Sequence, residues 1–554
     1  MSALKIFNLG GVSVQKNMYI YEYEDEAIIV DCGIGFPESD DFGVDIVIPD
    51  FDYVLSIKDK IKGLVLTHAH EDHYSATPFL LRDMSLTIYS HPIVKGFLEN
   101  KLKDYKNYNK PTFKEISDSD TINIGKNFTL YPYRVNHSVP STMGFYIKTP
   151  AGVVVHQTDF KFDWTPVMDK PTDVQKIASL SKQLNPLLLL SDSLGSTSPG
   201  FTLSEKFIED TFNEIVKDSK GQVFITTISS NISRIQQAIN CAITYNRKVI
   251  ISGYSIEKNV DVAMRLQLLK IEPGTIISEA DASKFRDDQI LYIVPGTYGQ
   301  VGSTLDKVAK GDHRTIKLHE GATVAFSSDP IPGTEPLVDK MIDELTLKGA
   351  HVVYSEIQDQ LHVSGHGSRG DLTLMAHLVN PTYFSPIGGG IKHMRAYKDM
   401  ISDQGFKAEN IFELQDGESL IVENNTVKKG EVLNIKDIFI DNNQDRSSVD
   451  NIVLKDRKLL ADSGVIFVVI PFRGEDPLYE NCEIYTRGFI FVKENQSLLK
   501  GMRKNVSETV KSLKGNKESQ DFTSFKKAVE KALAKHLYKR VGEAPVIVVE
   551  KLEL

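Results

Sequence analysis

The sequence predicts a mixed α/β protein made of several domains, and three observations carry this prediction. The chain has 554 residues, which at about 100–200 residues per domain suggests roughly three or four domains. Its amino-terminal part reads mainly as β-strands, whereas residues 203–359 alternate helices with short apolar strands. A polar stretch over residues 441–448 resembles a linker, and beyond it strands and a helix are mixed again.

The amino-terminal strands are expected from runs of β-branched and aromatic residues bounded by turns. Residues 18–30 form a hairpin pattern, because two such runs flank an acidic turn. A strand over Ile61–Leu66 precedes a helix near Ser75–Met84. Further strands are expected at Phe128–Val135, Gly144–Lys148 and Gly152–His156.

The middle of the chain shows the alternation that is typical of an α/β unit with a largely parallel sheet. The expected elements are a helix over Leu203–Asp218, a strand over Val223–Thr227, a helix from Ser233 and a strand over Lys248–Ser252.

Beyond the linker we expect strands at Val465–Ile470 and Gly488–Val492. A helix there places an apolar stripe on one face, made of Phe522, Phe525, Val529, Leu533 and Leu537. We interpret this stripe as a docking surface for another subunit or for the body of the protein. Packing within its own domain is the alternative.

Composition excludes several classes of protein. Sixty-four Lys and Arg against 74 Asp and Glu give a net charge of −10, which excludes the overall basicity of histone-like proteins but allows a local basic groove. The cysteines Cys32, Cys241 and Cys482 are too scattered for a disulfide framework or a cysteine zinc site. The start of the chain lacks a signal-peptide pattern, and no apolar run approaches the about 20 residues of a membrane span. We therefore expect a cytoplasmic protein without a membrane partner.

One short motif predicts a metal site. His68, His70, Asp72 and His73 place four potential ligands within six residues, on the loop between a strand and a helix. Histidine and carboxylate side chains are ligands that zinc prefers when cysteine is absent. The alternative is a solvated histidine-rich loop.

Two further candidates stand just past predicted strands, His137 and Asp159. Taken singly, each is more often a capping or turn residue than a ligand. Beside the histidine motif they become candidate ligands, because a pair of hydrolytic metal ions needs a bridging carboxylate.

Together with Val30-Asp31-Cys32-Gly33, this pattern resembles the metallo-β-lactamase superfamily. Segments spread over nearly the whole chain narrow the resemblance to ribonuclease J: residues 17–26, 36–38, 44–50, 159–163, 191–193, 234–237, 362–366 and 537–540. The resemblance implies a metallo-β-lactamase αββα sandwich with an inserted β-CASP α/β domain and a small α+β carboxy-terminal domain. The implied boundaries are 1–202 and 369–435 for the sandwich, 203–368 for the insertion, 436–450 for a linker and 451–554 for the last domain.

The resemblance also implies the ligands of two zinc ions. One zinc would be held by His68, His70 and His137 and the other by Asp72 and His73, with Asp159 bridging the two. Asp31 would orient the ligands. The zinc-activated water would attack phosphorus, His366 would protonate the leaving oxygen, and Asp192 would orient that imidazole. The resemblance also places Asp72, besides its role as a ligand, among the catalytic residues.

A second role implied by the resemblance is phosphate binding by one glycine-containing segment. Its residues are His362, Val363, Ser364, Gly365 and His366, with Ser230 and Asn231 as a weaker second contact. Gly365 allows close approach, and oriented N–H groups bind anions. From the residues alone, the two histidines of this segment are better interpreted as core residues four positions apart. Lys161, Arg234 and Lys392 are candidates for contacts to the RNA backbone.

The sequence departs from the family where a histidine usually completes the second zinc site, because Gly388 stands there. We therefore expect two zinc ions per chain, with the second held weakly. This departure fits the second-paralogue type of ribonuclease J.

The resemblance implies an RNA phosphodiesterase of RNA maturation and decay. It would combine endonucleolytic cutting with 5′-to-3′ exonucleolytic removal of nucleotides, on single-stranded RNA, as a homodimer or homotetramer. Two alternatives stay open. One is a weakly active or structural subunit that supports an active ribonuclease J paralogue in a mixed oligomer. The other is a small-molecule metallo-hydrolase, which would need neither the inserted domain nor the phosphate-binding segment.

Overall fold

A computed structural model describes most of the chain. The described residues are 2–12, 14–38, 41–330, 333–358, 360–441, 447–489, 495–514, 521–542 and 544–554. The chain divides into two compact units, one made of Met1–Phe36 and Val47–Ile438 and the other of Pro37–Ile46 and Phe439–Leu554. The finer domain boundaries expected from the sequence stay predictions.

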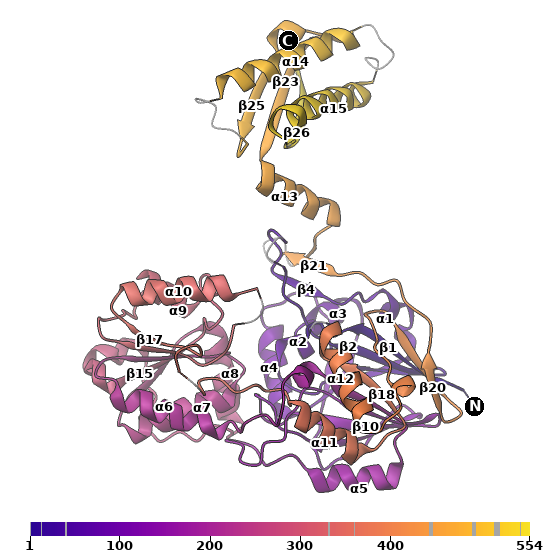
Figure 1. The fold of residues 1–554 in the computed structure, drawn as a ribbon, viewed down its shortest axis with the longest axis vertical. Coiled ribbons are helices and arrows are strands. Elements are labelled where there is room, and N and C mark those ends of the chain that lie inside the picture. Colours follow the sequence, from indigo (N-terminus) through magenta and orange to yellow (C-terminus); the bar gives the residue numbers. More distant parts are fainter. Residues whose placement is uncertain are drawn as a thin grey trace. The chain divides into compact units, whose positions relative to one another are not determined.

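A sandwich of two sheets forms the larger part of the first unit (Figure 1). Among the described residues one sheet has the order β20-β19-β1-β2-β3-β5-β6-β7 and the other the order β18-β12-β11-β10-β9-β8. The first contains β1 (Leu4–Gly10), β2 (Met18–Tyr23), β3 (Glu26–Val30), β5 (Ile61–Val65), β6 (Thr87–Ser90), β7 (Thr112–Glu115), β19 (Ser419–Glu423) and β20 (Thr426–Lys429). The second contains β8 (Ile122–Ile124), β9 (Phe128–Arg134), β10 (Met143–Thr149), β11 (Gly152–Gln157), β12 (Leu188–Asp192) and β18 (Tyr383–Ile387). The short strand β4 (Ile46–Ile48) lies outside both sheets.

Apolar side chains of both sheets meet between them and form one core. Tyr21 and Ile28 come from the first sheet, and Phe145 and Val154 from the second. Alternate residues of a strand point to opposite faces, so the second sheet also buries an outer face, under helices. The predicted αββα sandwich is therefore confirmed.

Helices flank the sandwich on both sides. Before β8 these are α1 (Asp52–Ser56), α2 (Glu71–Tyr74), α3 (Thr77–Asp83) and α4 (Pro92–Leu102), with the short turn η1 (Lys58–Lys60). On the second sheet they are α5 (Val174–Leu184), α11 (Arg369–Val379) and α12 (Ile391–Asp403), with η2 (Leu194–Thr197) and η5 (Ala408–Asn410).

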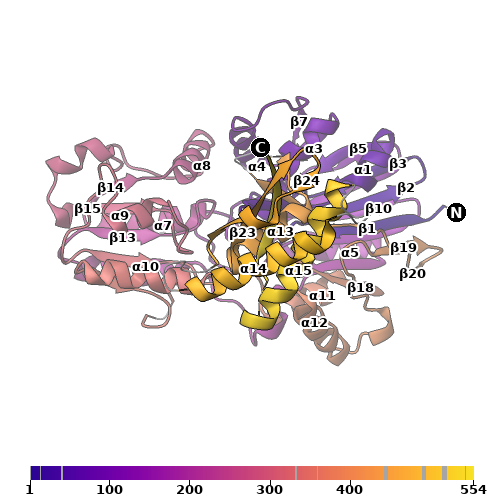
Figure 2. The ribbon, with the colours of Figure 1, turned by 90° about the horizontal axis from the view of Figure 1, so that it is seen from above.

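The inserted domain has a parallel sheet of its own, in the order β14-β15-β13-β16-β17. Its strands are β13 (Val223–Thr226), β14 (Lys248–Ile251), β15 (Ile290–Val294), β16 (Thr323–Phe326) and β17 (His351–Val353). Its helices are α6 (Lys206–Asp218), α7 (Ile232–Thr244), α8 (Tyr254–Arg265), α9 (Thr304–Lys310) and α10 (Glu335–Leu347), with the turns η3 (Glu279–Lys284) and η4 (Asp287–Gln289). Helices α6 and α7 lie on one side of the sheet and α9 and α10 on the other (Figures 1 and 2). The predicted α/β alternation is confirmed.

The chain leaves the sandwich and returns to it at neighbouring points. Arg369 N–H donates to the Ser198 carbonyl at 3.0 Å, and Gly370 N–H donates to the Gly200 carbonyl at 2.7 Å. After the return, β18 pairs in parallel with β12, and β19 pairs antiparallel with β1. The end of the first unit thus completes both sheets of the sandwich.

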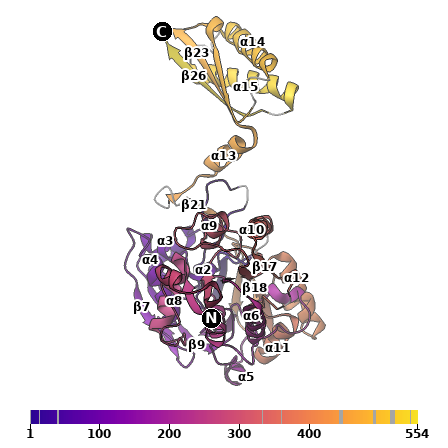
Figure 3. The same cartoon turned by 90° about the vertical axis from the view of Figure 1, so that its left-hand side faces the viewer.

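The second unit contains a small α+β domain (Figure 3). Strand β23 (Val465–Arg473) pairs with β24 (Asp476–Pro477) and β25 (Glu483–Arg487) antiparallel and with β26 (Val546–Glu553) in parallel. The other elements are β21 (Ile438–Asp441), β22 (Ser447–Ser448), α13 (Asn451–Ser463), η7 (Tyr479–Asn481), α14 (Gln496–Leu513) and α15 (Phe522–Val541). Of the predicted strand Gly488–Val492, the first two residues lie past the end of β25, and residues 490–492 are outside the described part, as are residues 442–446 of the polar stretch.

The apolar stripe of α15 is covered by its own domain. Phe525, Val529, Leu533 and Leu537 are buried in one cluster with residues of α14 and β23. The interpretation of this stripe as a docking surface is therefore wrong, because the helical periodicity of a stripe does not say which surface covers it. Among the described residues, no helix is long and apolar enough to cross a membrane.

Candidate metal centre

The predicted ligands gather at one edge of the sandwich because each follows the end of a strand. His68 and His70 follow β5, and Asp72 and His73 lie in the short helix α2. His137 follows β9, Asp159 follows β11, and Asp192 is the last residue of β12. The carboxyl ends of strands are where open α/β sheets place their ligands.

Oxygen Oδ2 of Asp159 is the centre of the cluster. It lies 3.3 Å from Nε2 of His73, 3.7 Å from Nε2 of His137 and 3.8 Å from Nε2 of His68. Asp159 itself is buried, with 4% of its surface exposed. One carboxylate therefore faces several imidazoles, as the bridging role requires.

Three histidines and Asp159 form a group with the donor set of a zinc site: His68, His70, His137 and Asp159. Nδ1 of His70 lies 3.0 Å from Nε2 of His137 and 3.3 Å from Nε2 of His68. Burial lowers the pKa of all three rings, that of His70 to about 4. Neutral rings whose nitrogens converge in a buried space fit a metal cation, because they bind one through their lone pairs.

Asp72, His73 and Asp159 form a second group. His73 donates from Nδ1 to Oδ2 of Asp31 at 2.7 Å, which leaves Nε2 facing Asp159. Burial alone would lower the pKa of His73. The carboxylates of Asp159, Asp72 and Asp31 outweigh this effect and raise the pKa well above its usual value. This group is rich in negative charge, and a cation bound there would neutralise it.

Asp31 orients His73 from a strained backbone. Its φ is 60°, in a region that side chains other than glycine rarely adopt. The carboxylate also accepts two hydrogen bonds from Thr67, one from its backbone N–H and one from its hydroxyl, both at 2.8 Å. These bonds hold the carboxylate against Nδ1 of His73 and match the orienting role that the resemblance implies.

Asn17 is a site residue that the sequence patterns did not predict. Its Nδ2 lies 3.1 Å from Nε2 of His73 and 3.4 Å from Oδ2 of Asp72. Hydrogen bonds hold it there, because its backbone N–H and its Nδ2 both donate to the Asp72 carbonyl, at 3.0 and 3.3 Å. No spacing signal in the sequence marks Asn17.

His366 and Asp192 form a hydrogen-bonded pair beside this cluster. His366 donates from Nδ1 to Oδ2 of Asp192 at 2.8 Å. Although burial opposes it, Asp192 and Asp159 raise the pKa of His366 to about 9. The imidazole is therefore held beside the His and Asp cluster, where Asp159, Asp192 and His366 form a third close group. Its role as general acid stays a prediction.

Gly388 follows β18 at the same edge, and it offers no ligand. Its φ is 66°, and a Cβ built there would lie 3.5 Å from Asp192 Oδ1 and 3.6 Å from Asp159 Oδ1. These distances are ordinary contacts, so there is room for a Cβ atom, but the backbone conformation disfavours a side chain.

The segment predicted to bind phosphate lies against the cluster. His137 donates from Nδ1 to the Gly365 carbonyl at 2.7 Å, and His366 N–H donates to Ser364 Oγ at 3.0 Å. Val363 is buried, and Nδ1 of His362 has no hydrogen-bond partner within the described residues.

Ser230 and Asn231, the weaker phosphate-contact candidates, lie just before α7 and are largely buried. Asn231 Oδ1 accepts a hydrogen bond from the N–H of Arg234 at 2.9 Å and so caps that helix. The Asn231 side-chain oxygen is therefore engaged in capping the helix.

Two of the basic residues expected at the RNA backbone are wholly buried instead. Lys161 and Arg234 have no exposed surface, and each forms an ion pair with Glu205, at 3.0 and 2.8 Å. The prediction that they contact RNA is wrong, because charge alone does not show burial. Lys392 is exposed at the start of α12.

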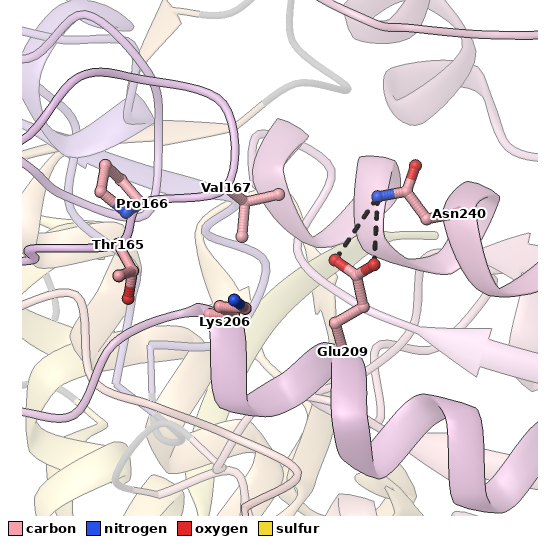
Figure 4. A pocket seen from close by; sticks show the side chains of 6 residues that line it. All are labelled: Thr165, Pro166, Val167, Lys206, Glu209 and Asn240. Atoms are coloured by element: carbon pink, nitrogen blue, oxygen red, sulfur yellow. Dashed lines mark hydrogen bonds between the residues drawn. The ribbon is translucent and has the colours of Figure 1, made fainter.

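A cavity of about 280 Å³ lies away from these residues (Figure 4). It is lined by Thr165, Pro166, Val167, Lys206, Glu209 and Asn240. Within it Asn240 donates to Glu209 at 3.4 Å. None of the predicted site residues lines it, so the candidate site is the His and Asp cluster.

Comparison with known proteins assigns parts of the chain to families. Residues 12–185 match the metallo-beta-lactamase superfamily, residues 220–345 the beta-CASP domain of ribonuclease J, and residues 452–554 the ribonuclease J C-terminal domain. Ribonuclease J 1 of Streptococcus pyogenes serotype M3 is 33% identical, over 98% of this chain and 96% of its own. Ribonuclease J2 of Bacillus subtilis is 32% identical, over 98% of both chains.

A solved structure titled a protein of unknown function from Enterococcus faecalis shares the fold. Its TM-score is 0.52 at 14% identity, over 76% of this chain and all of the other.

Proposed function

Because this chain belongs to the ribonuclease J family, with its metallo-β-lactamase fold and β-CASP insertion, we propose that it is an RNA phosphodiesterase that combines endonuclease and 5′-to-3′ exonuclease activity. The observation that carries the proposal is the position of Asp159, whose Oδ2 lies within 3.8 Å of ring nitrogens of His68, His73, His137 and His366. Ligand and acid chemistry thus meet at one carboxylate.

The proposed metal ligands are His68, His70 and His137 for one zinc and Asp72 and His73 for a second, shared through Asp159. Zinc bound there would supply an acidified water and positive charge for the phosphate oxygens. Two residues of the chain orient these ligands. Asp31 accepts a hydrogen bond from Nδ1 of His73, and the Gly365 carbonyl accepts one from Nδ1 of His137, so that Nε2 of each ring faces the site.

His366 is the proposed general acid. It carries the proton that the leaving 3′ oxygen needs, and Asp192 keeps the ring charged and turned toward Asp159. The segment 362–366 would hold the phosphate through backbone N–H groups, which places the scissile bond between the acid and the ligand cluster.

Cleavage of a 5′-labelled single-stranded RNA tests the proposal, with zinc per chain measured on the same sample. Release of labelled mononucleotide indicates the exonuclease, and internal fragments indicate the endonuclease. A chain that binds zinc but leaves RNA intact would overturn the proposal.

Gly388 favours a second candidate, a weakly active subunit that supports a ribonuclease J paralogue in a mixed oligomer. The second ligand group has three protein ligands, so its zinc would be held less tightly. Relatives named ribonuclease J 1 and ribonuclease J2 match about equally, so identity does not separate the two candidates. Light scattering of the chain alone distinguishes a homodimer or homotetramer from a subunit that needs a partner.

A further inference from the structure

A buried ion triad joins the sandwich to the inserted domain. Glu205, just before α6, accepts from Lys161 Nζ through Oε1 at 3.0 Å and from Arg234 Nη2 through Oε2 at 2.8 Å. Lys161 follows the bridging Asp159 by two residues, whereas Arg234 lies on α7 of the insertion. All three side chains are almost fully buried.

Both cations also hold the phosphate-binding segment. Lys161 Nζ donates to the Ser364 carbonyl at 3.0 Å, and Arg234 Nη1 donates to the Leu361 carbonyl at 3.2 Å. The same Nη1 donates to the carbonyl of Ser327 at 2.9 Å, and the Ser327 hydroxyl donates to the Leu361 carbonyl at 2.7 Å. The Leu361 carbonyl is therefore fixed toward Arg234, and the Ser364 carbonyl is fixed toward Lys161.

The fixed carbonyls determine where the N–H groups point. In a trans peptide the C=O of one residue and the N–H of the next point in opposite directions. Because the Leu361 and Ser364 carbonyls face the triad, the N–H groups of His362 and Gly365 face away from it. Within the described residues these two N–H groups have no backbone or side-chain acceptor, which is the arrangement that an anion requires.

We propose that Glu205, Lys161 and Arg234 are positioning residues, which hold segment 361–366 in its phosphate-binding form and thereby place His366 over Asp159. The inference rests on the proposed function, because it names what orients the RNA phosphate and the acid. The triad carries one net positive charge beneath the segment. Since both cations are buried, they favour the phosphate through the oriented peptides and the field, without touching RNA.

Arg234→Lys tests the proposal, because lysine keeps the charge but lacks the planar fork that reaches Glu205 and two carbonyls at once. We expect kcat to fall between about tenfold and a hundredfold through misplacement of the acid, with zinc per chain unchanged. Arg247→Lys is the matched control. Arg247 is also buried in the insertion and donates to the carbonyls of Ser219, Gly221 and Ile290, away from the segment. Its kcat should stay near wild type.

The salt dependence of RNA affinity separates positioning from contact. A lysine or arginine that touches single-stranded RNA contributes about 0.7 to the slope of log affinity against log salt. We expect Arg234→Met to weaken RNA binding without changing that slope. A slope reduced by about 0.7 would make Arg234 a contact residue and overturn the proposal.

Hydrogen exchange of the peptide that covers residues 361–366, measured without RNA, gives a readout independent of activity. Exchange should be faster in Arg234→Lys than in the wild type and in Arg247→Lys. Unchanged exchange, or an equal loss of kcat in both variants, would overturn the positioning role. If the wild type cleaves no RNA, the proposed function fails, and the exchange result still decides whether the triad holds the segment.

Discussion

His366 and Asp192 lie 174 residues apart in the chain and share a hydrogen bond of 2.8 Å. The bond runs from the end of the insertion to the last residue of β12, and it leaves Nε2 of His366 3.8 Å from Oδ2 of Asp159. The proposed acid is thus oriented by a carboxylate outside the two proposed metal ligand sets. Asp192 can therefore be substituted without removing a proposed metal ligand.

Asp192→Asn should move the alkaline limb of the cleavage rate to lower pH. The acid works when protonated, and the Asp192 carboxylate helps to raise its pKa to about 9 against the effect of burial. A neutral amide removes that charge, so the His366 proton is lost at lower pH and activity falls earlier as pH rises. Profiles of kcat against pH at saturating zinc measure the shift, and an unchanged alkaline limb would argue against His366 as the acid.

His366→Ala should slow cleavage by about 10²–10⁴-fold, the usual contribution of a positioned general acid. Zinc per chain should stay at the wild-type value, because the proposed ligands are untouched. Metal analysis by mass spectrometry accompanies the rate measurement. Loss of zinc in step with activity would instead identify His366 as a ligand.

Asp159→Ala should remove both zinc binding and cleavage. The variant deletes the one carboxylate shared by both ligand groups, so two cations would face each other without the charge between them. Zinc titration by calorimetry measures the loss. A variant that keeps its zinc and its activity would make Asp159 a turn residue and move the site elsewhere.

Gly388→His should raise zinc affinity at the second ligand group, because a Cβ there has room beside Asp159 and Asp192. The cost is a φ of 66°, which disfavours a side chain by about 1–2 kcal/mol. Gly388→Ala carries the same backbone cost without an imidazole and is the matched control. If the wild type already binds two zinc ions tightly and the histidine variant gains nothing over the alanine variant, the weakened-subunit candidate loses its support.

Glu205→Gln should lower the free energy of unfolding at neutral pH, and the loss should be smaller at acidic pH. Burial opposes ionisation, but Lys161 and Arg234 lower the pKa of Glu205 to about 2, from its ordinary value of 4.5. Because the pKa of Glu205 is lower in the folded than in the unfolded protein, the ionised side chain stabilises the fold by about 3 kcal/mol above about pH 4.5. This contribution is lost as the pH falls toward 2. Urea unfolding from pH 7 to 3 measures the difference, which should shrink with falling pH.

The ligand cluster was predictable because the sequence concentrates it. Four donors stand within six residues, from His68 to His73, and such a density rarely arises without a metal to bind. The strand ends before His137 and Asp159 point to the same edge. The alternation of helices and strands also predicted the parallel sheet of the insertion, whereas the two-sheet sandwich was predicted only from the resemblance to a known family.

Burial was what the sequence could not show. Lys161 and Arg234 have the charge of RNA contacts, and only the fold brings them to Glu205 inside the protein. Glu205 itself is an ordinary glutamate before a helix, without a spacing signal. The stripe of α15 has one periodicity whether it docks or packs within its domain.

The late return of the chain to the sandwich has a consequence for synthesis on the ribosome. Strand β18 pairs with β12, and β19 with β1, yet both emerge only after the whole inserted domain. Until then β12 and β1 are open sheet edges, which tend to pair with other chains. The insertion can fold early around its own core, so the nascent chain combines a finished domain with an unfinished sandwich, and that interval is when it is most exposed to aggregation.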